Sequence, residues 1–224
     1  MSNLKIITGH YGSGKTEVCV NLAVKYAKDA NEKCILADLD IVNPYFRSRE
    51  KDELFEKMGI HLVANNLDMP NMTAEIPALS SELFGLIDNK KDNILFDVGG
   101  DGNGARVLSR FAHLISARDY DMYLVLNANR PFTRDVKSAM DYITDIQNHS
   151  RLKINGIINN THLLRETSIE DIKRGSALAE EVSAHTGIPV IFNVIPARLE
   201  DECINAGTDK LFILEELYMR PDWL

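Results

Sequence analysis

The most constraining feature of this sequence is the octapeptide at residues 9–16, Gly-His-Tyr-Gly-Ser-Gly-Lys-Thr: a glycine, four free positions and then Gly-Lys-Thr. An apolar run of strand type, residues 4–8, precedes it, and residues 17–30 have helical spacing. Between a strand and a helix, such glycines let successive N–H groups point at phosphate oxygens, and the helix adds its positive end. We therefore expect phosphate binding by Gly9, Gly12, Ser13, Gly14 and Lys15, and Mg²⁺ ligation by Thr16.

Carboxylates end two further runs of strand type. Asp38 and Asp40 end the run 33–40, and Asp97 ends the run 93–97. Two carboxylates two positions apart on a strand project to the same side, and together they need a cation. A carboxylate after an apolar strand often holds Mg²⁺, directly or through water. Asp97 and Gly100 also have the D-x-x-G spacing of a switch, in which a glycine N–H approaches the γ-phosphate.

Strand-type runs alternate with helical spacing along the chain. Strands are predicted at 4–8, 33–40, 61–65, 93–97, 122–126, 154–159 and 190–195, and helices at 17–30, 44–58, 77–88, 105–115, 133–148 and 168–186. The tail from residue 210 fits either a strand or a helix. The pattern predicts one α/β domain over residues 1–224, an open and mostly parallel sheet with helices on both faces. Ligands of such sheets bind beyond the carboxyl ends of the strands, where Gly9, Asp40, Gly100 and Asn159 fall.

Composition narrows the class of protein. The 224 residues are 45% hydrophobic and 26% charged, as in an ordinary globular protein, and no window approaches the length of a membrane span. The net charge of −8 argues against binding of nucleic acid or anionic membrane by the whole surface, and no basic patch is evident. The three scattered cysteines predict buried, reduced thiols. We expect a cytoplasmic protein.

The phosphate loop, the paired aspartates and the aspartate–glycine switch together resemble the deviant-Walker P-loop ATPases of the ParA, MinD and cobyrinate-synthetase type, over most of the chain. The resemblance implies a P-loop NTPase fold with ATP and Mg²⁺ as cofactors. It further implies that Asp40 orients the attacking water, that Asp38 supports the metal shell and that Asp97 holds Mg²⁺ through water. Slow hydrolysis, a protein partner and an ATP-dependent homodimer follow from it as well.

The sequence departs from those relatives at residue 10. Their loop reads Gly-Lys-Gly-Gly-x-Gly-Lys-Thr, and its first lysine reaches the partner's phosphates across an ATP-sandwiched dimer. His10 takes that position here, and histidine is a weak cation at neutral pH. Arg47 and Arg49 are better candidates for the missing positive charge, which would act as an arginine finger does. Alternatively, these two arginines simply belong to a solvated helix face.

The nucleobase is predicted from residues 159–162, Asn-Asn-Thr-His, which stand where a guanine reader carries Asn-Lys-x-Asp. His162 cannot supply the carboxylate that guanine requires, whereas Asn159 can pair with the edge of adenine. The turn at Pro196 resembles the family's loop over the base. ATP is therefore preferred to GTP. Residues 130–134, Arg-Pro-Phe-Thr-Arg, either report the nucleotide state to a partner or form a surface helix start with Thr133 as N-cap.

Three functions remain open at this stage. The first is a slow Mg²⁺-dependent ATPase that acts as a switch on a protein partner. The second is an ATP-dependent synthetase of the dethiobiotin or cobyrinate type. The third is a non-hydrolysing nucleotide-binding module, or a protein like the GTPase metallochaperones. Glu215 and Glu216 lie in the tail, so the membrane targeting of the MinD branch is not supported.

Overall fold

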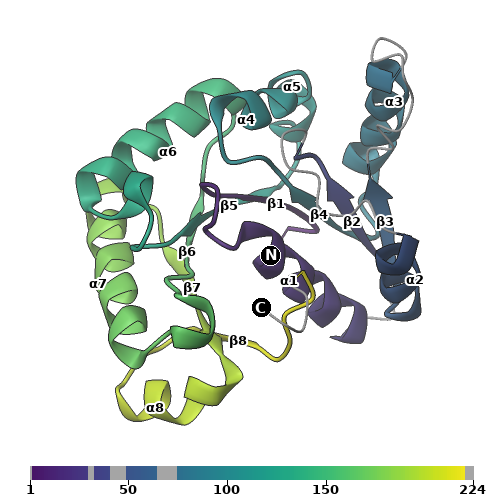
Figure 1. Cartoon of the computed structure of the whole chain (residues 1–224). Helices are drawn as coiled ribbons and strands as arrows, with labels where there is room; N and C mark the ends of the chain where they lie inside the picture. The colour runs from purple at the N-terminus through teal and green to yellow at the C-terminus, as the bar shows by residue number, and fades with distance from the viewer. Residues whose placement is uncertain (1, 30–32, 41–48, 65–74, 220–224) are drawn as a thin grey trace.

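The strands assemble into one parallel sheet in a computed structural model that describes all residues except 1, 30–32, 41–48, 65–74 and 220–224 (Figure 1). The strand order is β3-β2-β4-β1-β5-β6-β7-β8, and every pairing is parallel. Their bounds are β1 (Leu4–Thr8), β2 (Cys34–Asp38), β3 (Ile60–Ala64), β4 (Asn93–Asp97), β5 (Asp121–Leu126), β6 (Gly156–Asn159), β7 (Val190–Pro196) and β8 (Leu211–Leu214). The predicted α/β class is confirmed.

Helices cover both faces of this sheet. α1 (Lys15–Asp29) and α2 (Arg49–Lys57) pack on one face, and α3 (Glu75–Asp88), α4 (Gly102–Ser109), α5 (Ala112–Ile115), α6 (Val136–Ser150) and α7 (Ile169–Thr186) pack on the other. Neighbours in β1 show the division, since Ile6 packs in the α3–α7 core and Ile7 in the α1–α2 core. Burial on both faces explains why the strands are apolar without alternation. A third cluster joins α7, β7 and α8 (Glu200–Asn205).

Local signals set several element boundaries. Ser168 and Asp171 form a reciprocal capping box at the start of α7, and Gly187 ends the helix with φ 73°. The predicted N-cap Thr133 is wrong. Asp135 caps α6 by accepting a hydrogen bond from Ser138 N, whereas Thr133 ends the short helix η1 (Pro131–Thr133) and donates its hydroxyl hydrogen to Asn127 O. The N-terminal part of the predicted helix 44–58 lies outside the described residues.

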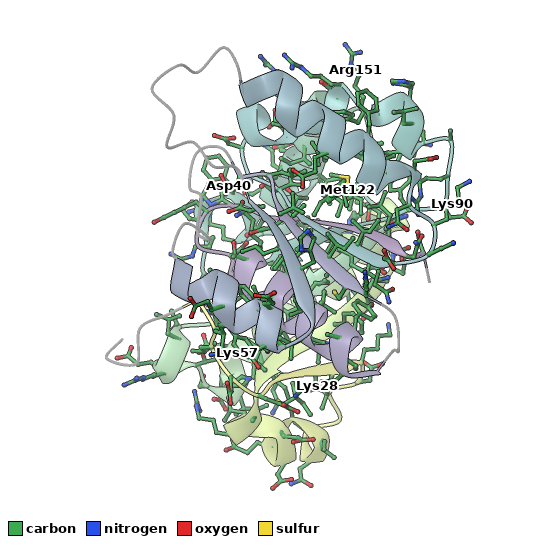
Figure 2. The ribbon with its side chains drawn as sticks, turned by 90° about the vertical axis from the view of Figure 1, so that its right-hand side faces the viewer. Lys28, Asp40, Lys57, Lys90, Met122 and Arg151 are labelled. Atoms are coloured by element: carbon green, nitrogen blue, oxygen red, sulfur yellow. The ribbon has the colours of Figure 1, made fainter. Side chains whose placement is uncertain are left out.

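The carboxyl ends of the strands meet at one edge of the sheet, and the loops that follow β1, β2, β4, β5, β6, β7 and β8 gather there. Asp40 lies at this edge, and Lys90, just before β4, lies on the opposite side of the molecule (Figure 2). The ambiguous tail forms β8 and then continues past α1. Cys19, Cys34 and Cys203 are free and buried. Among the described helices, none is both long and apolar enough to cross a bilayer.

Gly175, inside α7, gives a test of this packing. A Cβ there would lie 2.1 Å from Thr161 Oγ1 and 2.3 Å from Asn159 Oδ1, and both side chains are buried and hydrogen-bonded. Alanine usually stabilises a helix by about 0.5–1 kcal/mol relative to glycine. We nevertheless expect Gly175→Ala to lower the free energy of unfolding by about 1–3 kcal/mol in urea denaturation, as overpacking does.

The matched control is Gly85→Ala in α3. No described atom lies within 4 Å of a Cβ added at Gly85. The higher helix propensity of alanine should therefore be the main effect, and it should raise the free energy of unfolding by up to about 1 kcal/mol. A gain in stability at Gly175 would contradict the close approach of α7 to the end of β6.

Candidate functional site

The phosphate loop, residues 9–16, curls back on itself between β1 and α1. Gly12 and Gly14 have φ of 76° and 79°, in the left-handed region that favours glycine. Ser13 N donates to His10 O at 2.9 Å, and Val18 N donates to Gly14 O at 3.0 Å as the helix begins. The backbone therefore has the curled path that the motif predicts.

Neighbouring loops fix this path from outside. Asn160 Nδ2 donates to Ser13 O at 2.8 Å, and Arg130 Nε donates to Gly12 O at 2.9 Å. Gly100, in the loop after β4, packs so closely that a Cβ on it would lie 1.9 Å from Gly9 O. With two loop carbonyls held in this way, the loop is braced by the segments after β4, β5 and β6.

Lys15 is the centre of a buried charge cluster. Its Nζ lies 2.8 Å from Asp40 Oδ2 and 3.7 Å from Asp97 Oδ1. Thr16 Oγ1 donates to Asp97 Oδ2 at 2.6 Å. All four side chains are buried, with Asp97 at 0% exposure. The fold thus brings together four residues that the sequence assigned to phosphate, water and metal.

A third carboxylate makes the cluster more acidic. Asp38 pairs in register with Asp97 on the neighbouring strand, and its Oδ1 accepts a hydrogen bond from Asp40 N at 2.9 Å. Burial, followed by the charge of Asp97, raises the pKa of Asp38 to about 7. Burial also raises the pKa of Asp97, although Lys15 and Thr16 oppose the shift. Three buried carboxylates around one ammonium group favour a further cation.

The residues present fit Mg²⁺. Asp97 Oδ1 is fully buried and has no hydrogen-bond partner among the described residues. The other oxygen of the same carboxylate, Oδ2, accepts the hydrogen bond from Thr16 Oγ1. Mg²⁺ in phosphate-transfer sites is held by one or two carboxylates together with phosphates and waters. No cluster of three or more His, Cys, Asp or Glu side chains suited to a metal occurs in the described part of the chain.

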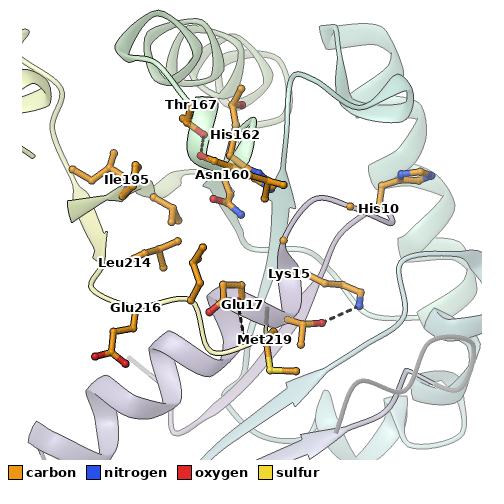
Figure 3. A pocket seen from close by; sticks show the side chains of 18 of the residues that line it. His10, Lys15, Glu17, Asn160, His162, Thr167, Ile195, Leu214, Glu216 and Met219 are labelled. Carbon is orange, nitrogen blue, oxygen red and sulfur yellow. Dashed lines mark hydrogen bonds between the residues drawn. The ribbon is translucent and has the colours of Figure 1, made fainter. Parts of the chain in front are cut away.

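A cavity of about 620 Å³ opens beside the phosphate loop, within the usual range for small-ligand sites (Figure 3). Its polar end includes Lys15, Thr16, Asp40 and Gly100. The other end is more apolar. It is formed by residues at the ends of β6, β7 and β8 and after them, which include Asn160, Thr161, His162, Leu164, Pro196, Ala197, Leu214, Leu217 and Met219, with Arg198, Glu215 and Glu216 as charged members.

Comparison with known proteins identifies the fold alone. No family model and no curated protein sequence matches the chain. FtsY from Mycoplasma mycoides matches with a TM-score of 0.53 and 17% identity over 85% of this chain and 58% of that one. FtsY from Thermotoga maritima matches with a TM-score of 0.54 and 16% identity over 99% and 65%. FlhF complexed with GMPPNP and Mg²⁺ matches with a TM-score of 0.51 and 20% identity over 84% and 64%.

The fold is that of the P-loop NTPases. The chain spans 58% and 65% of the length of the two FtsY structures, so the similarity covers only part of those proteins.

Not all of the predicted site residues line the cavity. Asn159 does not line the cavity, because its amide donates to Asn193 Oδ1 and its Oδ1 accepts from Thr161 N and Oγ1. Its neighbour Asn160 faces the cavity instead. Asp38 is also absent from the cavity lining and lies buried behind Asp40.

The remaining predicted residues divide between the cavity, the surface and the part not described. Pro196 and Gly100 line the cavity as expected. His10 lines it too, but its ring stacks on Phe132, with centroids 4.5 Å apart. Arg47 lies outside the described residues, and Arg49 is described only as the first residue of α2.

The sequence reasoning did not assign Asn160 and Arg130 to the phosphate loop. The sequence feature that could have identified them is their position, because each follows a strand that ends at the same edge of the sheet as β1.

The raised pKa of Asp38 predicts how stability depends on pH without metal. Between about pH 4 and pH 7 the folded protein binds more protons than the unfolded chain, so the free energy of unfolding falls as the pH rises. Each pKa unit corresponds to about 1.4 kcal/mol, which makes the loss a few kcal/mol. We expect thermal denaturation in EDTA to show this slope for the wild type and a flatter one for Asp38→Asn.

Asp135→Asn is the control for this measurement. The backbone N–H of Ser138 lowers the pKa of Asp135, so this carboxylate stabilises the protein above its unfolded pKa and loses that effect as the pH falls. Asp135→Asn should therefore change the pH dependence of the free energy of unfolding only at acid pH. Identical profiles for the wild type and Asp38→Asn would refute the assignment.

Proposed function

We propose that this protein binds ATP with Mg²⁺, hydrolyses it slowly and uses the change from ATP to ADP to act on a protein partner. The observation that carries the proposal is the buried cluster of Lys15, Thr16, Asp40 and Asp97 at the start of α1. Lys15, Thr16 and Asp40 of this cluster line a cavity of nucleotide size. A lysine and carboxylates buried at the N-terminal end of a helix behind a glycine loop are suited to phosphoryl transfer.

Lys15 would exchange partners when ATP binds. Its ammonium group is satisfied by Asp40 at 2.8 Å, and phosphate oxygens would replace that carboxylate. Asp40 would then be able to hold and orient a water molecule. Thr16 and Asp97 would hold Mg²⁺, with Asp38 behind them; the ion supplies neutralisation of charge on the phosphate oxygens.

The residues at the far end of the cavity support adenine. Asn160, Thr161 and His162 follow β6, and none of them carries the carboxylate with which a protein pairs guanine N1–H. FtsY from Elizabethkingia anophelis was solved with GDP and FlhF with GMPPNP, so GTP is the competitor that any binding experiment must include.

A partner surface is proposed around the outer side of the phosphate loop. Tyr11 is 65% exposed and Phe132 is 56% exposed, and His10 joins them by stacking on Phe132. Exposed aromatic side chains that gather in this way are typical of interaction sites. The partner is either another protein or a second copy in an ATP-dependent homodimer. The buried free thiols support a reducing, cytoplasmic compartment.

Calorimetry tests nucleotide binding. We expect the wild type to bind ATP and ADP more tightly with Mg²⁺ than in EDTA, and to prefer ATP to GTP. Lys15→Ala and Asp97→Asn should each weaken MgATP about 10–100-fold, because each removes a charged contact. Lys57→Ala, at the end of α2 and outside the cavity, should have no effect. Absence of Mg²⁺-dependent nucleotide binding by the wild type would refute the proposal.

Turnover and assembly are tested with Asp40→Ala. This variant frees Lys15, so MgATP affinity should be kept or increased while ATP hydrolysis falls about 100-fold or more. Size measurement with ATP, ADP and no nucleotide should reveal a larger species only with ATP. Equal background turnover of both proteins would instead indicate a non-hydrolysing module, and ADP release that depends on an added carboxylate metabolite would indicate a synthetase.

A further inference from the structure

The tail strap, residues 215–219, returns from β8 to the first turn of α1. Glu17, the residue directly after Thr16, accepts hydrogen bonds from Tyr218 N at 2.7 Å and from Met219 N at 3.1 Å. Asn21, one turn later, donates its Nδ2 hydrogens to Glu17 Oε1 at 3.1 Å and to Glu216 O at 3.3 Å. The helix that begins at the phosphate loop thus also anchors the tail strap.

These contacts use mainly the backbone of the strap. Hydrogen bonds from two N–H groups to one carboxylate are charge-assisted and stronger than neutral ones. The only side-chain ion pair recorded for the described part of the strap, Lys28–Glu215, is 62% and 71% exposed and contributes little. Glu17 therefore fixes the backbone of the strap at Tyr218 and Met219, whose side chains also pack against the α1–α2 core.

The strap lines one side of the cavity, next to the first turn of α1. Leu217 and Met219 of the strap line the cavity together with Pro196, the last residue of β7, and Ala197. Figure 3 shows Met219 beside Glu17. Leu217 is 47% exposed, although it is a large apolar side chain at the mouth of a cavity. A flat apolar ligand group bound there would cover it, and a nucleobase has that shape and character.

We propose, as an extension of the proposed function, that the tail strap is the wall against which the nucleobase packs, and that Glu17 is the positioning residue that holds this wall. The Glu17 carboxylate accepts hydrogen bonds from two backbone N–H groups of the strap. The contribution of the base to binding should therefore depend on Glu17, and the contribution of the phosphates should not.

The experiment compares two ligands that share phosphates but differ in the base. Calorimetry with MgATP and with magnesium tripolyphosphate is done on the wild type, Glu17→Ala, Glu17→Gln and Lys28→Ala. We expect Glu17→Ala to weaken MgATP about tenfold and to leave tripolyphosphate within about twofold. Glu17→Gln should lie between, since one of its two acceptor oxygens becomes a donor. Lys28→Ala removes an exposed strap contact and should change neither affinity.

A second variant, Leu217→Ser, keeps the test valid if Glu17→Ala does not fold. Leu217 is exposed and belongs to no core cluster among the described residues, so its replacement should affect MgATP alone. Equal weakening of both ligands by Glu17→Ala, or no weakening of MgATP by either variant, would overturn the role of the strap. A wild type that binds neither ligand would overturn the proposed function itself, whereas equal affinity for both would overturn only this inference.

Discussion

The ion pair between Lys15 and Asp40 is the interaction on which the site depends. Both groups are buried, and a buried charge is tolerated only when it is paired and hydrogen-bonded. Asp97 and Thr16 complete the network, and Asp38 adds a carboxyl group whose pKa burial and the charge of Asp97 raise to about 7. A phosphate group that enters the loop would replace Asp40 as the partner of the Lys15 ammonium group. The fold therefore already holds the positive charge that a phosphate needs.

The parallel sheet makes this network possible. Asp38, Asp97 and the end of β1 lie side by side because β2, β4 and β1 are neighbours in register, with Asp38 opposite Asp97 and Asp97 opposite Ile7. Lys15 follows directly as α1 begins. The cluster therefore needs no long-range adjustment of loops, and the strands themselves set its spacing. Asn160 and Arg130, from the next two strands on the other side, hold the loop carbonyls.

The sequence was sufficient where a motif specifies both the residue type and its place. The loop at 9–16, Asp40 and Asp97 belong to this group, as does the alternation that gave the sheet. The sequence was not sufficient to predict which of two neighbouring side chains faces the cavity. Asn159, the last residue of β6, bonds to Asn193 inside the protein, whereas the next residue, Asn160, bonds to Ser13 O in the phosphate loop, as expected when neighbours in an extended chain project to opposite sides. The strap was not predictable, because residues 215–219 have no periodicity and their partner Glu17 is about 200 residues away.

The bonds from Glu17 to Tyr218 and Met219 span 201 and 202 positions of the sequence. Contacts of such separation form late, since the loop entropy must be overcome before they add stability. The contacts that brace the phosphate loop, Arg130 to Gly12 and Asn160 to Ser13, span only 118 and 147 positions. On a ribosome, the residues that brace the phosphate loop would therefore emerge before the residues of the strap, and the strap side of the cavity would form after the loop.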